Sequence, residues 1–151
     1  MLKGLDPLLS PELLYLLARM GHGDDLAIVD LNHPAETVAR ATTSGVLIRL
    51  PGVAVERVVQ AVLSLLPLDD FTDDPVRLMQ VVGEADATPE AMADILHSVH
   101  ASGFTGKIAR LERFEFYEAA KASFGVIQCG DPRFYGNVLL RMVAIAGKWP
   151  V

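Results

Sequence analysis

The stretch that decides the fold is SPELLYLLARMGHGDDLAIVD, residues 10–30. Ser10 and Pro11 suit the N-cap and the first position of a helix, and the leucines that follow repeat at a spacing that gives one apolar face. Gly21 ends this helix, and the apolar run Leu26–Val29 predicts a short buried strand. A helix, a tight turn and a strand in immediate succession indicate an α/β protein.

The same alternation continues along the chain. The expected strands are Val46–Leu50, Val76–Val82, Ile108–Leu111, Val126–Cys129 and Val138–Ile145, and the expected helices are Val55–Leu66, Pro89–His100 with Thr88 as N-cap, and Phe114–Ser123. This order predicts a layered α/β fold with helices on both faces of a sheet, in a single domain over residues 1–151. The last two strands follow one another without a helix, so we expect a mixed sheet.

Composition excludes several classes of protein. The chain has 151 residues, a formal net charge of −6 and no cluster of lysine and arginine, which argues against a nucleic acid partner. Its apolar runs are far shorter than a membrane span. The mean hydropathy of +0.33 is high for a small monomer, so we expect apolar surface to be buried between subunits. Residues 1–6 lack the features of a signal peptide, and Cys129 is the only cysteine. We expect a cytoplasmic protein.

His22 is the first candidate for chemistry, because glycines flank it on both sides and weaken regular structure there. The same pattern also fits a helix end, at which the glycines shape the backbone and the histidine favours the helix dipole. Asp30 closes the strand that follows, and ligands bind at strand ends in α/β sheets. An aspartate in that place also serves as the cap of an ordinary turn.

Two further segments are candidates for ligand binding. In Tyr135-Gly136-Asn137, a glycine between two hydrogen-bonding side chains allows a close approach of the backbone to a ligand, although an ordinary turn has the same composition. Arg113 begins a helix, where a positive charge opposes the helix dipole. This placement favours an anchoring or ligand-binding role, with a surface salt bridge as the common alternative.

Asp94, His97 and His100 share one face of a predicted helix, so a metal site is conceivable. Loose clusters of this kind are more often solvated, and we expect no metal. His33 either lines a pocket or lies in a loop. The chain has no nucleophile elbow, no P-loop and no dinucleotide-binding glycine motif, so no cofactor is expected.

These motifs, in this order, resemble the ribose pyranase/fucose mutarotase (RbsD/FucU) family of sugar-ring isomerising proteins. The matching segments are Met1–Lys3, Leu8–Asp24, Asp30, Pro34-Ala35, Arg113–Glu118 and Tyr135–Leu140. Gly23, Arg113 and Gly136 bring the chain closer to the fucose mutarotases than to the ribose pyranases. The segment Leu31–His33 and residues 69–107 depart from the family pattern.

The resemblance implies a compact α/β/α sandwich that assembles into homo-oligomeric rings, commonly decamers, with the pocket near subunit contacts. It implies that His22 is the acid/base histidine and that Asp30, Arg113 and Tyr135-Gly136-Asn137 bind a monosaccharide. The expected activity is interconversion of the anomers of L-fucose or a related aldose, by general acid–base ring opening and closure. Histidine suits that chemistry near neutral pH. Asp30, Tyr117 and water remain open as the complementary base. The alternatives are a ribose pyranase-type isomerase and a non-catalytic sugar-binding ring protein.

Overall fold

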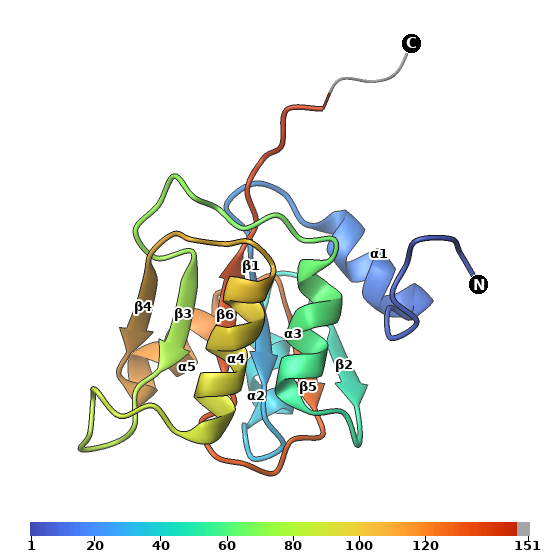
Figure 1. The fold of residues 1–151 in the computed structure, drawn as a ribbon. Coiled ribbons are helices and arrows are strands. Elements are labelled where there is room, and N and C mark those ends of the chain that lie inside the picture. Colours follow the sequence, from blue (N-terminus) through green and yellow to red (C-terminus); the bar gives the residue numbers. More distant parts are fainter. Residues whose placement is uncertain (148–151) are drawn as a thin grey trace.

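The computed structural model describes residues 1–147, which form five helices around one six-stranded sheet (Figure 1). The helices are α1 (Pro11–Arg19), α2 (Ala35–Ala41), α3 (Val55–Leu63), α4 (Glu90–Ala101) and α5 (Arg113–Lys121). The strands are β1 (Asp25–Val29), β2 (Leu47–Leu50), β3 (Val76–Met79), β4 (Ile108–Leu111), β5 (Gly125–Cys129) and β6 (Val138–Arg141).

The sheet is mixed, as the missing helix between the last two strands predicted. Its strand order is β2-β5-β1-β6-β3-β4. The pairs β1/β5, β2/β5 and β3/β4 are parallel, whereas β6 runs antiparallel to both of its neighbours, β1 and β3. Because β6 is reversed, its first residue lies at the edge of the sheet where the parallel strands end. The segment before β6 therefore lies at the same edge of the sheet as the carboxyl ends of β1, β3, β4 and β5.

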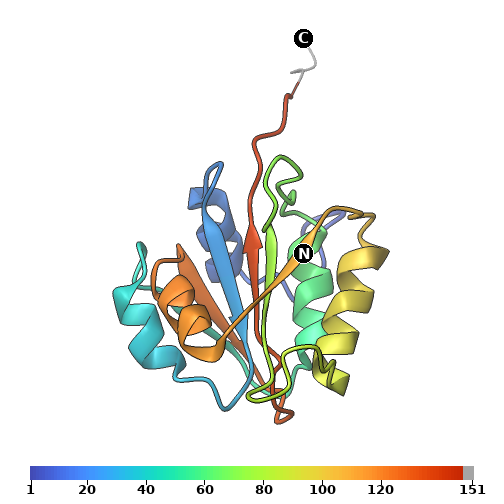
Figure 2. The same ribbon diagram turned by 90° about the vertical axis from the view of Figure 1, so that its left-hand side faces the viewer.

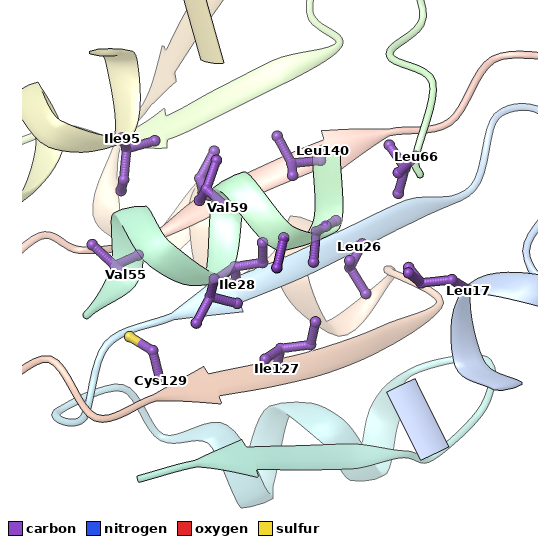
Figure 3. Packing of buried hydrophobic residues seen from close by; sticks show 14 of the residues in the cluster. Leu17, Leu26, Ile28, Val55, Val59, Leu66, Ile95, Ile127, Cys129 and Leu140 are labelled. Atoms are coloured by element: carbon purple, nitrogen blue, oxygen red, sulfur yellow. The ribbon is translucent and has the colours of Figure 1, made fainter. Parts of the chain in front are cut away.

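Helices cover both faces of the sheet, which confirms the predicted three-layer architecture (Figure 2). Helices α1, α3 and α4 pack on one face and α2 and α5 on the other. Side chains that alternate along a strand reach opposite faces, so Leu26 and Ile28 of β1 join the first core, while Ala27 and Val29 join the second. Figure 3 shows the first core, in which residues of α3 and α4 lie against the central strands.

One predicted helix cap is confirmed and another is wrong. The Ser10 hydroxyl accepts a hydrogen bond from the Leu13 N–H at 3.2 Å, and Pro11 occupies the first turn of α1. At α4, Pro89 occupies the N-cap position instead of Thr88. The Thr88 hydroxyl instead accepts a hydrogen bond from the Arg110 guanidinium at 2.8 Å. The threonine therefore connects the start of α4 to the edge strand β4.

The structure adds one helix and shortens two predicted strands, and α3 and α5 end at Leu63 and Lys121, before the predicted Leu66 and Ser123. Helix α2 was not predicted, because it has only seven residues and no side-chain cap, too little for a helical period to stand out. The expected strand Val76–Val82 is too long, since β3 ends at Met79 and Val82 lies exposed in the following loop. The last strand ends at Arg141, four residues before the predicted end. Within residues 1–147, no helix is both long enough and apolar enough to cross a membrane.

Candidate active site

A cavity of about 270 Å³ lies at the carboxyl edge of the sheet. Polar and aromatic side chains, together with Met79, line it from four segments: Asp30, Asn32, His33, Met79, Arg113, Tyr117, Phe134, Tyr135 and Asn137. The strand ends of an open α/β sheet are where such folds bind ligands. The structure thus brings Asp30, Arg113, Tyr135 and Asn137, four of the residues singled out from the sequence, around one small cavity.

Asp30 organises the cavity wall. Its side chain is only 3% exposed. One carboxylate oxygen accepts hydrogen bonds from the Gly136 N–H at 3.1 Å and the Asn137 side-chain amide at 3.0 Å, and the other accepts from the Asn32 N–H at 2.9 Å. In return, the Asp30 N–H donates to Asn137 Oδ1 at 3.1 Å. Burial raises the pKa of Asp30, although these hydrogen bonds oppose the shift.

Gly136 has a packing role that its sequence context did not predict. A methyl group in place of its hydrogen would meet Asp30 Cβ at 3.3 Å, Val55 Cγ1 at 3.5 Å and Ala91 Cβ at 3.7 Å. The missing side chain therefore leaves room for Asp30 and the starts of α3 and α4. Gly136 is not among the residues that line the cavity, and its contact there is the hydrogen bond to Asp30.

Tyr135 adopts a left-handed backbone with φ of 63°, the one non-glycine residue to do so between residues 1 and 147. Such a conformation costs on the order of 1–3 kcal/mol for a non-glycine residue and persists only where surrounding contacts impose it. Its hydroxyl accepts a hydrogen bond from the Val82 N–H at 3.1 Å, which ties the aromatic ring to the loop after β3.

Arg133 links the segment before β6 to α3 and α4 through ion pairs. Its guanidinium bonds to Asp131 and Asp94, each at 2.7 Å, and to Glu56 at 2.9 Å. Asp131 is 2% exposed and also accepts a hydrogen bond from the Val55 N–H, the first residue of α3, at 3.1 Å. Hydrogen bonding to Arg133 lowers the pKa of Asp131 to about 2.

Arg113 begins α5, as the sequence predicted, and its side chain lines the cavity. Glu112 caps this helix and accepts hydrogen bonds from the N–H groups of Phe114 and Glu115. The guanidinium carbon of Arg113 lies 4.7 Å from the centre of the Phe114 ring. Arg113 Nε is buried without a hydrogen-bond partner in residues 1–147, and no carboxylate of those residues pairs with the side chain. The arginine can therefore donate to a ligand.

His33, for which the sequence left a pocket or a loop open, and Tyr117, one of the candidates for the complementary base, both line the cavity. His33 is 6% exposed, and its ring centre lies 5.2 Å from that of Tyr117 and 6.0 Å from that of Phe116, edge to face. Its Nε2 is buried without a hydrogen-bond partner among the described residues. Leaving such a group unpaired costs about 1–3 kcal/mol. Burial lowers the pKa of His33 to about 4, against an opposing effect of the Asn137 side chain, so the imidazole is neutral at pH 7.

His22 lies at the edge of the sheet opposite the cavity. Two residues and all of β1 separate it from Asp30, and a strand of that length spans about 15 Å. The side chain is exposed, and its Nδ1 accepts a hydrogen bond from the Ala144 N–H at 3.1 Å. Because β6 is reversed, the segment after it leaves the sheet at this edge (Figure 1). Within one chain, His22 is thus not beside Asp30.

The three residues considered for a metal site have other surroundings. Asp94 binds the Arg133 guanidinium, and His97 and His100 are exposed on α4. No group of three histidine, cysteine, aspartate or glutamate side chains in the part of the chain that the structure describes could hold a metal ion. Cys129 is buried, and its Sγ donates to the Val29 carbonyl at 3.2 Å.

The fold and the cavity define a class of protein: a three-layer α/β protein with a small polar ligand site at the carboxyl edge of a mixed sheet. The chain belongs to the RbsD / FucU transport protein family, whose model matches residues 3–145.

Comparisons with individual proteins agree with this membership. The chain is 40% identical to the human fucose mutarotase over 148 residues, which cover 96% of this chain and 95% of the human one. Its fold is similar to the crystal structure of the fucose mutarotase from Streptococcus pneumoniae in complex with L-fucose, with a TM-score of 0.85, 29% identity, and coverage of 96% of this chain and 100% of that one. The Bacillus subtilis RbsD complexed with D-ribose shares the fold, with a TM-score of 0.71 and 22% identity, over 97% of this chain and 100% of that one.

Proposed function

We propose that this chain is an L-fucose mutarotase, an isomerase that interconverts the α and β anomers of L-fucose by opening and closing the sugar ring. The observation that carries the proposal is the cavity at the carboxyl edge, lined by Asp30, Arg113, Tyr135 and Asn137. Its volume of about 270 Å³ suits a monosaccharide, because sites for larger, drug-sized ligands run to about 300–1,000 Å³. Relatives named fucose mutarotase match nearly the whole chain.

The reaction needs two proton transfers. Ring opening breaks the bond between the anomeric carbon and the ring oxygen, while the ring oxygen gains a proton and the anomeric hydroxyl loses one. The resulting aldehyde rotates and closes again on its other face, so no redox change or added group is required. General acid–base catalysis supplies about 10²–10⁴-fold for such a step.

Asp30 is the best candidate for the base. A carboxylate offers about four acceptor positions, and three hydrogen bonds within the protein use three of them. Because Asp30 also lines the cavity, its carboxylate can meet a sugar hydroxyl there. Burial raises the pKa of this carboxyl, which brings it closer to the neutral range in which a general base is most effective.

His22 is our candidate for the proton donor. Because Nδ1 accepts the Ala144 N–H, the proton of the neutral imidazole lies on Nε2, the nitrogen directed away from its own chain's hydrogen bond. Within one chain this group lies at the edge opposite the cavity. We therefore propose that His22 of one copy acts on the sugar in the cavity of a neighbouring copy.

The surface around the cavity supports contact with a second copy. Four large apolar side chains are exposed there, on the segments that form the cavity wall: Leu31, Val82, Phe114 and Phe134. Apolar groups gathered at a site mark a protein contact more often than single exposed ones do. We propose self-association into a homo-oligomeric ring, a decamer by the family pattern. Light scattering should then give about ten times the chain mass of 16.3 kDa.

Anomer exchange of L-fucose, followed by saturation-transfer NMR, tests the activity. Wild type should accelerate exchange, and a folded His22→Ala protein should not. Co-assembly of His22→Ala with Arg113→Ala chains should restore part of the exchange, because some cavities would then combine an intact histidine with an intact arginine. No recovery in mixed assemblies would contradict the shared site, and unchanged exchange in His22→Ala would contradict the role of His22.

Two rivals are separated by the same assay. A ribose pyranase-type enzyme would exchange the forms of D-ribose faster than those of L-fucose. A sugar-binding ring protein without activity would bind L-fucose and leave its exchange rate unchanged.

We also propose a cytoplasmic location, which a single, buried and free cysteine suits.

A further inference from the structure

His33 is the one histidine of the cavity wall, and the scheme above gives it no part. It follows Asp30 and Leu31-Asn32 in the loop between β1 and α2. The loop is well fixed, because the His33 carbonyl accepts hydrogen bonds from the Ala35 N–H at 2.7 Å and from the Gln128 side chain at 3.4 Å. The backbone therefore holds the imidazole at the cavity rather than leaving it free to swing into solvent.

The surroundings of the ring are those of an aromatic core residue. Phe116 is fully buried against it, and Tyr117 packs edge to face on the cavity side. A phenylalanine could make these contacts without bringing a polar atom into an apolar environment. Instead, the chain holds an imidazole here, with Nε2 buried and unpartnered within residues 1–147. Packing alone gives no reason for this unpartnered nitrogen.

A sugar in the cavity supplies that reason. Each hydroxyl both donates and accepts hydrogen bonds, and a neutral imidazole offers one donor and one acceptor. We propose that His33 is a substrate-contacting residue whose neutral imidazole hydrogen-bonds one hydroxyl of the bound monosaccharide and so helps to decide which sugar is accepted. This inference rests on the proposed sugar-binding function and assigns a residue that determines its specificity.

The proposed contact involves a small movement of the ring or of its neighbours, because Nε2 itself is covered. The outer torsion of a histidine side chain is broad, so a modest rotation can expose a nitrogen to the cavity. Proton transfer is not the role assigned here. The buried position keeps the imidazole uncharged at pH 7, which suits a hydrogen-bonding partner and not a general base.

The test uses His33→Phe, which keeps an aromatic ring and removes both nitrogens, and His97→Phe on the exposed face of α4 as the matched control. Binding and anomer exchange are measured for L-fucose and for analogues that each have one hydroxyl replaced by hydrogen. His33→Phe should weaken L-fucose binding about tenfold, the loss expected for one buried hydrogen bond. For one analogue, wild type and His33→Phe should bind equally, which identifies the hydroxyl contacted. His97→Phe should match wild type throughout.

A second readout does not depend on activity. The imidazole ¹⁵N resonances of His33, assigned by their absence in His33→Phe, should shift when L-fucose is added. His33→Gln, which keeps a donor and an acceptor, should retain part of the lost affinity and serves if His33→Phe does not fold.

If wild type exchanges L-fucose while the His33 variants bind all sugars as wild type does, only this inference is overturned. If wild type neither binds nor exchanges L-fucose, the proposed function fails, and the ¹⁵N titration is repeated with other aldoses. A His33 signal that responds to none of them overturns the inference as well.

Discussion

Replacing Arg133 with methionine should destabilise the protein in a strongly pH-dependent way. The substitution keeps most of the apolar stem of the side chain and removes the guanidinium. Asp131, which is almost completely buried, then loses its two hydrogen bonds from the Arg133 guanidinium, at 2.7 Å and 3.0 Å. The carboxylate keeps two hydrogen-bond donors, the Val55 N–H at 3.1 Å and the backbone N–H of residue 133 at 3.0 Å, but no longer has a cation beside it.

The size of the effect follows from the pKa of Asp131, which falls from 3.8 to about 2 in the folded protein, chiefly by hydrogen bonding to Arg133. A shift of that size corresponds to roughly 2–3 kcal/mol of folding free energy. Because the folded-state pKa is lowered, this contribution is complete above about pH 4 and disappears as the pH falls towards 2. At pH 7 the variant should therefore melt about 5–10 °C below wild type.

Urea or thermal unfolding of both proteins between pH 7 and pH 3 measures the difference. Arg49→Met is the matched control, because Arg49 pairs with Glu36 at 3.2 Å where both side chains are well exposed, and such pairs contribute about 0–1 kcal/mol. A loss in Arg133→Met that is no larger than in the control, or one that stays constant down to pH 3, would refute the reasoning.

Three further changes probe the cavity wall and the core. Gly136→Ala would place a methyl group 3.3 Å from Asp30 Cβ and should destabilise the protein by about 1–3 kcal/mol, with weaker L-fucose binding in a titration. Asp30→Asn should weaken L-fucose binding at least tenfold, because an amide group cannot accept the three hydrogen bonds that the carboxylate takes from Asn32, Gly136 and Asn137; near-wild-type affinity would contradict this role. Burial raises the pKa of Cys129 to about 11, so its thiol should react with a disulfide reagent at pH 8 only after unfolding, and rapid labelling of the folded protein would contradict the packing described.

Much of the fold could be predicted from local signals. Apolar runs identified all six strands, and the missing helix before Val138 predicted the mixed sheet. Helix α2 escaped prediction because only three of its seven residues are buried and no side chain caps it. The ends of β3 and β6 depend on their pairing partners, Leu111 beside β3 and the isolated bridge from Leu68 to Met142. Sequence patterns do not contain such information.

The site could be predicted in part. Asp30, Arg113, Tyr135 and Asn137 combine chemical types and strand-end positions that point to ligand binding, and they do line one cavity. His22 precedes β1 and Asp30 follows it, so the predicted strand between them already places the two residues at opposite edges of the sheet. For His33 the sequence left a pocket and a loop open, and the structure shows that it lines the cavity. The role that we propose for His33 depends on its packing against Phe116, which is more than 80 positions away, and on the unpaired nitrogen that this packing buries.

The backbone conformation of Tyr135 also limits which amino acids can replace it. Its position requires a residue that tolerates a φ of 63° and a side chain long enough to reach the Val82 N–H. Glycine meets the first requirement and has no side chain, while asparagine and aspartate, which adopt this backbone more readily than most residues, are too short to meet the second. Larger residues that could reach Val82 would carry the same strain as tyrosine. Few of the twenty amino acids satisfy both conditions, so mutational tolerance at this position should be among the lowest in the chain.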